Sequence, residues 1–118
     1  MKNKKKILII EDDKDINRTL NLRLKMEDFE VLTAHEGYEG FYKAKTQEPD
    51  LIILDLKLPG LPGEEICKEL RKDEKSISLP IIMLTAKDTD VDKIIGKVIG
   101  ATQYMSKPFD MEQLLQKI

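Results

Sequence analysis

The sequence has very little cysteine and no long apolar run. Its single cysteine, Cys67, excludes an internal disulfide, which is consistent with a reducing compartment. No apolar stretch approaches the roughly 18 residues that cross a bilayer. The basic N-terminus runs into a short apolar stretch, residues 7–10, and then directly into acids, a pattern too short for a signal peptide. We therefore expect a cytoplasmic protein without a membrane partner.

Net charge is also nearly absent, although charged side chains are plentiful. The chain has 20 basic and 22 acidic residues, which leaves a formal net charge of −2. This balance gives no overall field to attract nucleic acid, so we expect no direct nucleic-acid binding by this chain. A length of 118 residues fits one domain, which we place at residues 1–118, and a hydrophobic fraction of 41% is compatible with one core.

Short apolar runs alternate with amphipathic stretches along the chain. Residues 7–10, 51–54 and 81–84 are aliphatic and end at polar residues, which predicts buried strands. Weaker strand patterns occupy residues 30–33 and 103–105. Because stretches of helical length separate these runs, the sequence predicts five β–α units. That order indicates the α/β class, with a parallel sheet covered by helices on both faces.

Helix-capping residues stand where the amphipathic stretches begin. Asp13 or Asp15 can cap the first helix, and Asp110 can cap the last. An apolar stripe within residues 91–98 predicts the fourth helix. The second helix is expected at about residues 36–46, where two glycines weaken its helical propensity.

Polar side chains follow the carboxyl ends of four expected strands. Glu11 and Asp12 follow the first, Asp55 the third, Thr85 the fourth and Lys107 the fifth. Each of them alone is more simply explained as a cap, a turn residue or a surface charge. Ligands of open α/β sheets bind outside this edge, however, so their joint placement favours a binding site.

The chemistry of these groups favours a cation and an anion bound together. Clustered carboxylates repel one another, and a hard cation such as Mg²⁺ removes that cost by binding carboxylate, carbonyl, water and phosphate oxygens. An ammonium and a hydroxyl suit an anion with several oxygens. An aspartate carboxylate can also accept a phosphoryl group covalently. The residues therefore predict Mg²⁺ and phosphoryl chemistry.

Four segments carry a close resemblance to the receiver domain of two-component response regulators. KILIIEDD resembles the first strand with its acidic pair, and PDLIILDLKLPGLPG resembles the phosphoacceptor strand and its loop. PIIMLTA resembles the fourth strand with its hydroxyl residue, and GATQYMSKPF the fifth with its switch aromatic and Lys-Pro pair. The match covers essentially the whole chain. It implies a flavodoxin-like three-layer sandwich, with five helices around a five-stranded parallel sheet of order 2-1-3-4-5.

The resemblance also implies roles for individual residues around the phosphoacceptor. Asp55 would take the phosphoryl group from a sensor histidine kinase or a histidine phosphotransfer protein, forming an aspartyl phosphate. Asp12 would bind Mg²⁺ directly, together with Asp55. Glu11 would hold metal-bound water, and Lys57 would contribute its main-chain carbonyl.

Further roles implied by the resemblance concern the response to phosphorylation. Thr85 and Lys107 would bind the phosphoryl oxygens. Thr85 and Tyr104 would form the switch that couples Asp55 to the surface of the fourth helix, fifth strand and fifth helix. The Lys107–Pro108 peptide would be cis. The sequence does not identify the output domain or protein that binds this surface.

Three other functions would leave different signals in the sequence or use the same fold differently. A phosphatase of the haloacid dehalogenase type would carry an acid two residues after its nucleophile, where this chain has Lys57. A flavodoxin would have a Ser, Thr and Gly-rich loop after the first strand, where this chain is acidic. We expect no enzyme, beyond slow self-dephosphorylation at most. The remaining alternative is a degenerate receiver used only for docking.

Two lysines flank the expected phosphorylation site. Lys57 and Lys87 lie two residues after Asp55 and Thr85, at positions that tune dephosphorylation in the family that the chain resembles. Their charges would slow or redirect the attack of water on an aspartyl phosphate.

Overall fold

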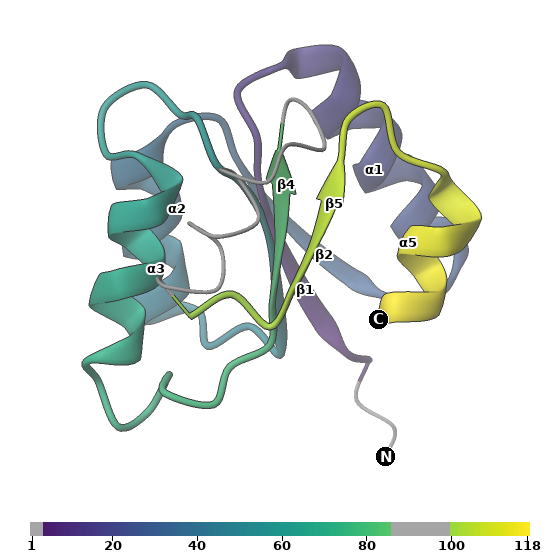
Figure 1. Ribbon diagram of the computed structural model, residues 1–118. Coiled ribbons are helices and arrows are strands. Elements are labelled where there is room, and N and C mark those ends of the chain that lie inside the picture. Colours follow the sequence, from purple (N-terminus) through teal and green to yellow (C-terminus); the bar gives the residue numbers. More distant parts are fainter. Residues whose placement is uncertain (1–3, 86–99) are drawn as a thin grey trace.

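Five parallel strands form one sheet through the middle of the computed structural model, which describes residues 4–85 and 100–118 (Figure 1). The strands are β1 Lys6–Ile10, β2 Glu30–Ala34, β3 Leu51–Asp55, β4 Ile81–Thr85 and β5 Gln103–Ser106. Their order is β2-β1-β3-β4-β5, which confirms the expected parallel sheet and its topology.

Helices cover both faces of this sheet, as the alternating pattern predicted. The described helices are α1 Lys14–Met26, α2 Gly37–Thr46, α3 Gly63–Arg71 and α5 Met111–Lys117. Helices α1 and α5 lie on one face, and α2 and α3 lie on the other (Figure 1). The helix expected within residues 91–98 lies outside the described residues. No helix in the part of the chain that the structure describes is long and apolar enough to span a membrane.

The core consists of two apolar clusters, one on each face of the sheet. Strand β1 shows why: Ile7 and Ile9 belong to the α1–α5 cluster, whereas Leu8 and Ile10 belong to the α2–α3 cluster. All four side chains are fully buried. A strand buried on both faces needs a continuous aliphatic run, and each such side chain stabilises the fold by about 1.5–3 kcal/mol.

Capping side chains start the helices beside the carboxyl edge of the sheet. Asp13 caps α1 by accepting hydrogen bonds from the N–H groups of Asp15 and Ile16, and Asp110 caps α5. Helix α2 forms despite its two glycines. At Gly40 the glycine is required, because a Cβ there would lie 2.6 Å from side-chain atoms of Ile10.

Arg71, at the end of α3, ties the start of β5 to the rest of the molecule. Its guanidinium donates to the carbonyl oxygens of Gly100 at 2.9 Å and Ser76 at 2.8 Å. Thr102 adds a two-way contact with Ile81: its N–H donates to the Ile81 carbonyl, and its hydroxyl accepts from the Ile81 N–H. The amino end of β5 is thus fixed beside β4.

We predict that Arg71→Met lowers the free energy of unfolding by about 1–3 kcal/mol, because two carbonyl groups lose their donor while the aliphatic stem is kept. Urea unfolding followed by circular dichroism measures the loss. Lys72→Met is the matched control, since Lys72 makes an exposed ion pair with Glu69. Equal destabilisation by both variants would contradict the role given to Arg71.

Candidate functional site

Three carboxylates meet at the carboxyl edge of β1 and β3. Glu11 and Asp12 directly follow β1, and Asp55 is the last residue of β3. Because Ile10 pairs with Leu54 in the register of these two strands, the residues that follow come to the same height in the sheet. One carboxylate oxygen from each acid lies within 4.8 Å of the others. Glu11 and Asp55 are buried, whereas Asp12 is exposed and opens the cluster to solvent.

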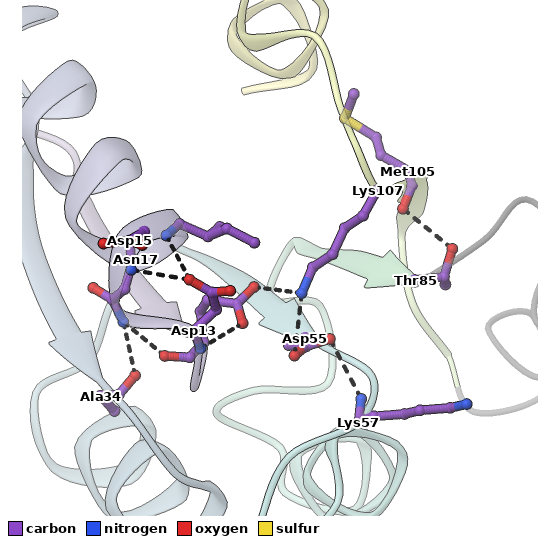
Figure 2. A network of polar contacts seen from close by, with 11 residues as sticks. Asp13, Asp15, Asn17, Ala34, Asp55, Lys57, Thr85, Met105 and Lys107 are labelled. Atoms are coloured by element: carbon purple, nitrogen blue, oxygen red, sulfur yellow. Dashed lines mark hydrogen bonds and ion pairs between the residues drawn. The ribbon is translucent and has the colours of Figure 1, made fainter.

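Lys107 extends into this cluster from the loop that follows β5 (Figure 2). Its Nζ lies 2.7 Å from Oε1 of Glu11 and 3.3 Å from Oδ2 of Asp55. Its main-chain N–H donates to the carbonyl of Thr85 at 2.7 Å, and its peptide bond to Pro108 is cis, as expected. One ammonium group therefore bridges two acids at the carboxyl ends of two different strands, β1 and β3.

Burial and like charge disturb the protonation of the central acid. Burial, followed by repulsion from Glu11, raises the pKa of Asp55 to about 7, although Lys107 acts in the opposite direction. For Lys107 itself, burial would lower the pKa. Its hydrogen bond to Glu11 and its attraction to Asp55 outweigh that effect, so the pKa of Lys107 is raised. The site thus holds more negative charge than Lys107 neutralises.

The donor set of the cluster fits a hard divalent cation. Glu11, Asp12 and Asp55 offer closely spaced carboxylate oxygens, which are the ligands that Mg²⁺ prefers. A bound cation would relieve the repulsion from Glu11, which adds to the effect of burial in raising the pKa of Asp55. The structure therefore brings together the three acids that the sequence analysis expected at the metal site.

Lys57 lies at the start of the loop after β3, close to the acids. Its N–H points toward Oδ1 of Asp55 at 3.4 Å, a distance too long for a strong hydrogen bond. Its side chain is exposed and extends away from Asp55 (Figure 2). The metal-binding role expected for its main-chain carbonyl stays a prediction.

Thr85 and Tyr104 lie on the neighbouring strands, β4 and β5. Thr85 is buried at the end of β4, and its hydroxyl donates to the carbonyl of Met105 at 3.3 Å (Figure 2). Tyr104 pairs with Met83 and packs, partly buried, against the α2–α3 cluster. Of the two expected switch residues, Tyr104 is therefore part of β5, and Thr85 is hydrogen-bonded to β5. Lys87, the second flanking lysine, lies outside the described residues.

Asn17 belongs to the framework of the site but was not predicted from the sequence. Its side-chain amide is buried and donates to the carbonyls of Glu11 at 2.9 Å and Ala34 at 3.1 Å. These bonds join α1 to the ends of β1 and β2. The available signal was its spacing, because Asn17, Leu20 and Leu24 form the buried face of α1.

Comparison with known proteins identifies the family. A family model described as the response regulator receiver domain matches residues 7–118. The chain belongs to this family. It is 43% identical over 114 residues to the alkaline phosphatase synthesis transcriptional regulatory protein PhoP of Bacillus subtilis. That match covers 97% of this chain and 47% of PhoP, so the receiver domain spans about half the length of this curated relative.

Solved structures agree with the fold of this receiver domain. A putative response regulator from Chloroflexus aurantiacus matches with a TM-score of 0.93 and 35% identity, covering 98% of this chain and 94% of that one. The chemotaxis protein CheY4 of Vibrio cholerae matches with a TM-score of 0.90 and 34% identity, covering 97% and 95%. The expected membership in two-component response regulators is thus confirmed.

The raised pKa of Asp55 makes the stability of the metal-free receiver domain depend on pH. The folded state favours the protonated acid, so this stabilisation is present below the unfolded pKa and is lost as pH rises through about 7. We predict that Asp55→Asn, which stays neutral, is more stable than wild type in EDTA at about pH 8, by about 1–3 kcal/mol. The advantage should shrink at about pH 5.

Urea unfolding at the two pH values measures this difference. Asp28→Asn is the control, because Asp28 is an exposed aspartate with a positive φ of 70° that asparagine also tolerates. An Asp55→Asn advantage that does not grow with pH, or one that the control shares, would contradict the prediction.

Proposed function

We propose that this receiver domain is a phospho-accepting switch and that Asp55 is its phosphoacceptor. The arrangement of Asp55 carries the proposal: it is the last residue of the central strand, it is buried, and its carboxylate faces both Lys107 and the other acids. A rigid strand end suits a nucleophile that must be held in line with its target. The presence of all the expected acids and the lysine disfavours a receiver used only for docking.

We further propose Mg²⁺ as the cofactor, bound by Asp12 and Asp55 directly, by Glu11 through water, and by the main-chain carbonyl of Lys57. When bound, Mg²⁺ would supply positive charge that neutralises both the carboxylates and the phosphoryl oxygens. The close approach of the three carboxylates supports this proposal.

The transfer reaction uses groups that the chain itself positions. A carboxylate oxygen of Asp55 attacks the phosphorus of a phosphohistidine, forming a P–O bond while the P–N bond to the imidazole breaks. Lys107 lies 3.3 Å from Asp55 and neutralises charge on the transferred group. The donor is a sensor histidine kinase or a histidine phosphotransfer protein. The domain is a phosphoryl acceptor and not an enzyme for an external substrate.

Thr85 and Tyr104 would couple the aspartyl phosphate to the surface of the domain. The 3.3 Å bond from the Thr85 hydroxyl to Met105 is long, and phosphoryl oxygens are stronger acceptors. A hydroxyl that exchanges Met105 for a phosphoryl oxygen makes a contact specific to the phosphorylated state, which shifts the conformational equilibrium. Tyr104, adjacent to Met105, would follow, and the change would reach β5 and α5.

The output of this switch is proposed from the similar protein PhoP, which is named a transcriptional regulatory protein. We propose that the receiver domain acts in the cytoplasm on a partner or linked domain that regulates transcription. Its own charge balance, −2 overall, gives no reason for direct binding to nucleic acid.

We predict that incubation with acetyl phosphate and MgCl₂ adds a single phosphoryl group, which intact-mass spectrometry detects. The adduct should be absent from Asp55→Asn, because asparagine lacks the nucleophilic carboxylate. Asp50→Asn, an aspartate at the opposite edge of the sheet that accepts from the Lys6 N–H, should retain the adduct. A wild-type protein without an adduct would instead favour a role in docking alone.

We also predict that Lys57→Met shortens the lifetime of the aspartyl phosphate by roughly 3- to 10-fold. The Lys57 side chain extends away from Asp55, but it is long and exposed, so its ammonium can turn toward the new phosphoryl oxygens and hinder the approach of water. Loss of the phosphoryl adduct over time, followed by mass spectrometry, gives the lifetime. Lys68→Met, on the exposed face of α3, is the control. An unchanged lifetime in Lys57→Met would exclude this role.

A further inference from the structure

The loop between β3 and α3 is held on its sheet side by backbone contacts that leave no room for a side chain. The N–H of Leu56 donates to the carbonyl of Leu84 at 2.9 Å, and the N–H of Gly63 donates to the carbonyl of Leu56 at 3.0 Å. A Cβ on Gly63 would lie 2.2 Å from the carbonyl oxygen of Asp55. The start of the loop is therefore fixed to the sheet.

The first turn of α2 holds the far side of the same loop. The N–H of Gly37 donates to the carbonyl of Pro59 at 3.1 Å. A Cβ on Gly37 would lie 1.8 Å from the carbonyl oxygen of Leu61, which is backbone and cannot rotate away. Two backbones thus approach more closely than any residue other than glycine permits at this position.

Glu36 and Tyr38 lie beside the tip of the loop at Gly60. The Glu36 carboxylate caps α2 by accepting from the N–H groups of Tyr38 at 3.2 Å and Glu39 at 2.6 Å. A Cβ on Gly60, where φ is +76°, would lie 2.8 Å from Oε2 of Glu36 and 3.2 Å from the Tyr38 ring. The cap that begins α2 therefore also contacts the loop.

We propose that the first turn of α2, residues 36–38, is a positioning element for the metal site. It holds the β3–α3 loop against the sheet and thereby sets the place of the Lys57 carbonyl. Within this loop, Lys57 lies between Leu56, which is hydrogen-bonded to β4, and Pro59, which is hydrogen-bonded to Gly37. The neighbouring Leu56 and Leu58 are buried, which leaves little freedom for the main chain between them. Functional groups need placement to within roughly 0.5 Å, so a shift of the loop should reach the metal.

This inference rests on the proposed function, because it takes the Lys57 carbonyl as a metal ligand. Helix α2 contributes no carboxylate to the acidic cluster, which consists of Glu11, Asp12 and Asp55 among the described residues. Residues 36–38 lie against the loop, whereas Gly40 packs against Ile10 of β1, so substitutions at Gly37 and Gly40 test these two contacts of α2 separately. Gly37→Ala is the direct test, since the added methyl group has to displace the main chain at Leu61.

We predict that Gly37→Ala raises the Kd for Mg²⁺ by roughly 10-fold, as supporting residues of metal sites commonly do. Isothermal titration with MgCl₂ alone measures the Kd, and urea unfolding in EDTA measures stability separately. Gly40→Ala is the matched control: it lies on the same helix, and its methyl group would meet side-chain atoms of Ile10 at 2.6 Å and not the loop. Both variants should lose stability, whereas Gly37→Ala alone should lose Mg²⁺ affinity.

The outcomes separate this inference from the proposed function. A wild-type protein that does not bind Mg²⁺ overturns the proposed metal site itself. A wild-type protein that binds, with the same Kd in folded Gly37→Ala or with equal losses in both variants, overturns the role of α2. If circular dichroism shows that Gly37→Ala does not fold, Glu36→Ala removes the cap and the contact with Gly60. A raised Kd in Glu36→Ala then supports the inference, and an unchanged Kd overturns it.

Discussion

The ion pairs of Lys107 with Glu11 and Asp55 are the interaction on which the carboxyl edge of the sheet depends. The buried carboxylates of Glu11 and Asp55 have oxygens within 4.8 Å of each other, so they repel strongly in a medium of low dielectric. A single ammonium, 2.7 Å from one and 3.3 Å from the other, lets them share the edge but leaves an excess of negative charge. An aspartyl phosphate would carry about −1.5 to −2 in place of the single charge of the ionised carboxylate, which increases the negative charge at the edge further. Burial, followed by repulsion from Glu11, raises the pKa of Asp55 to about 7, and the excess of negative charge at this edge makes a divalent cation the natural complement of the site.

The sheet supplies the rigidity that keeps these like charges together. Side chains of β1 and β3 are buried on both faces, so neither strand can withdraw its terminal acid without exposing apolar surface. The burial of each such side chain is worth about 1.5–3 kcal/mol, and many of them act together. The hydrogen bonds of Asn17 to the carbonyls of Glu11 and Ala34 add a fixed start for α1. Charge repulsion at the edge is thus offset by packing in the interior.

The sequence predicted the features that depend on local patterns of residues. It did not predict the features that depend on contacts between residues distant in the chain. Aliphatic runs predicted the strands to within a residue or two, and the parallel register then brought Glu11 and Asp55 to one edge. The structure and family comparisons confirm this fold, while the chemical roles of the site residues stay predictions. Arg71 and Gly37 could not be found this way, because their importance comes from contacts with carbonyls distant in the chain. The glycines that weakened α2 as a helix are required for its packing.

Different groups hold the two ends of β5, and this difference bears on the proposed switch. Its amino end is fixed by Arg71 and by the two-way contact between Thr102 and Ile81. At its carboxyl end, the Lys107 N–H bonds to Thr85, and the Thr85 hydroxyl bonds to Met105 through a long contact. Phosphoryl oxygens on Asp55 would compete for the Lys107 ammonium and the Thr85 hydroxyl, but for none of the groups at the amino end. A rearrangement driven from Asp55 would therefore start at the carboxyl end of β5, beside Tyr104, while the contacts of Thr102 keep the amino end in place.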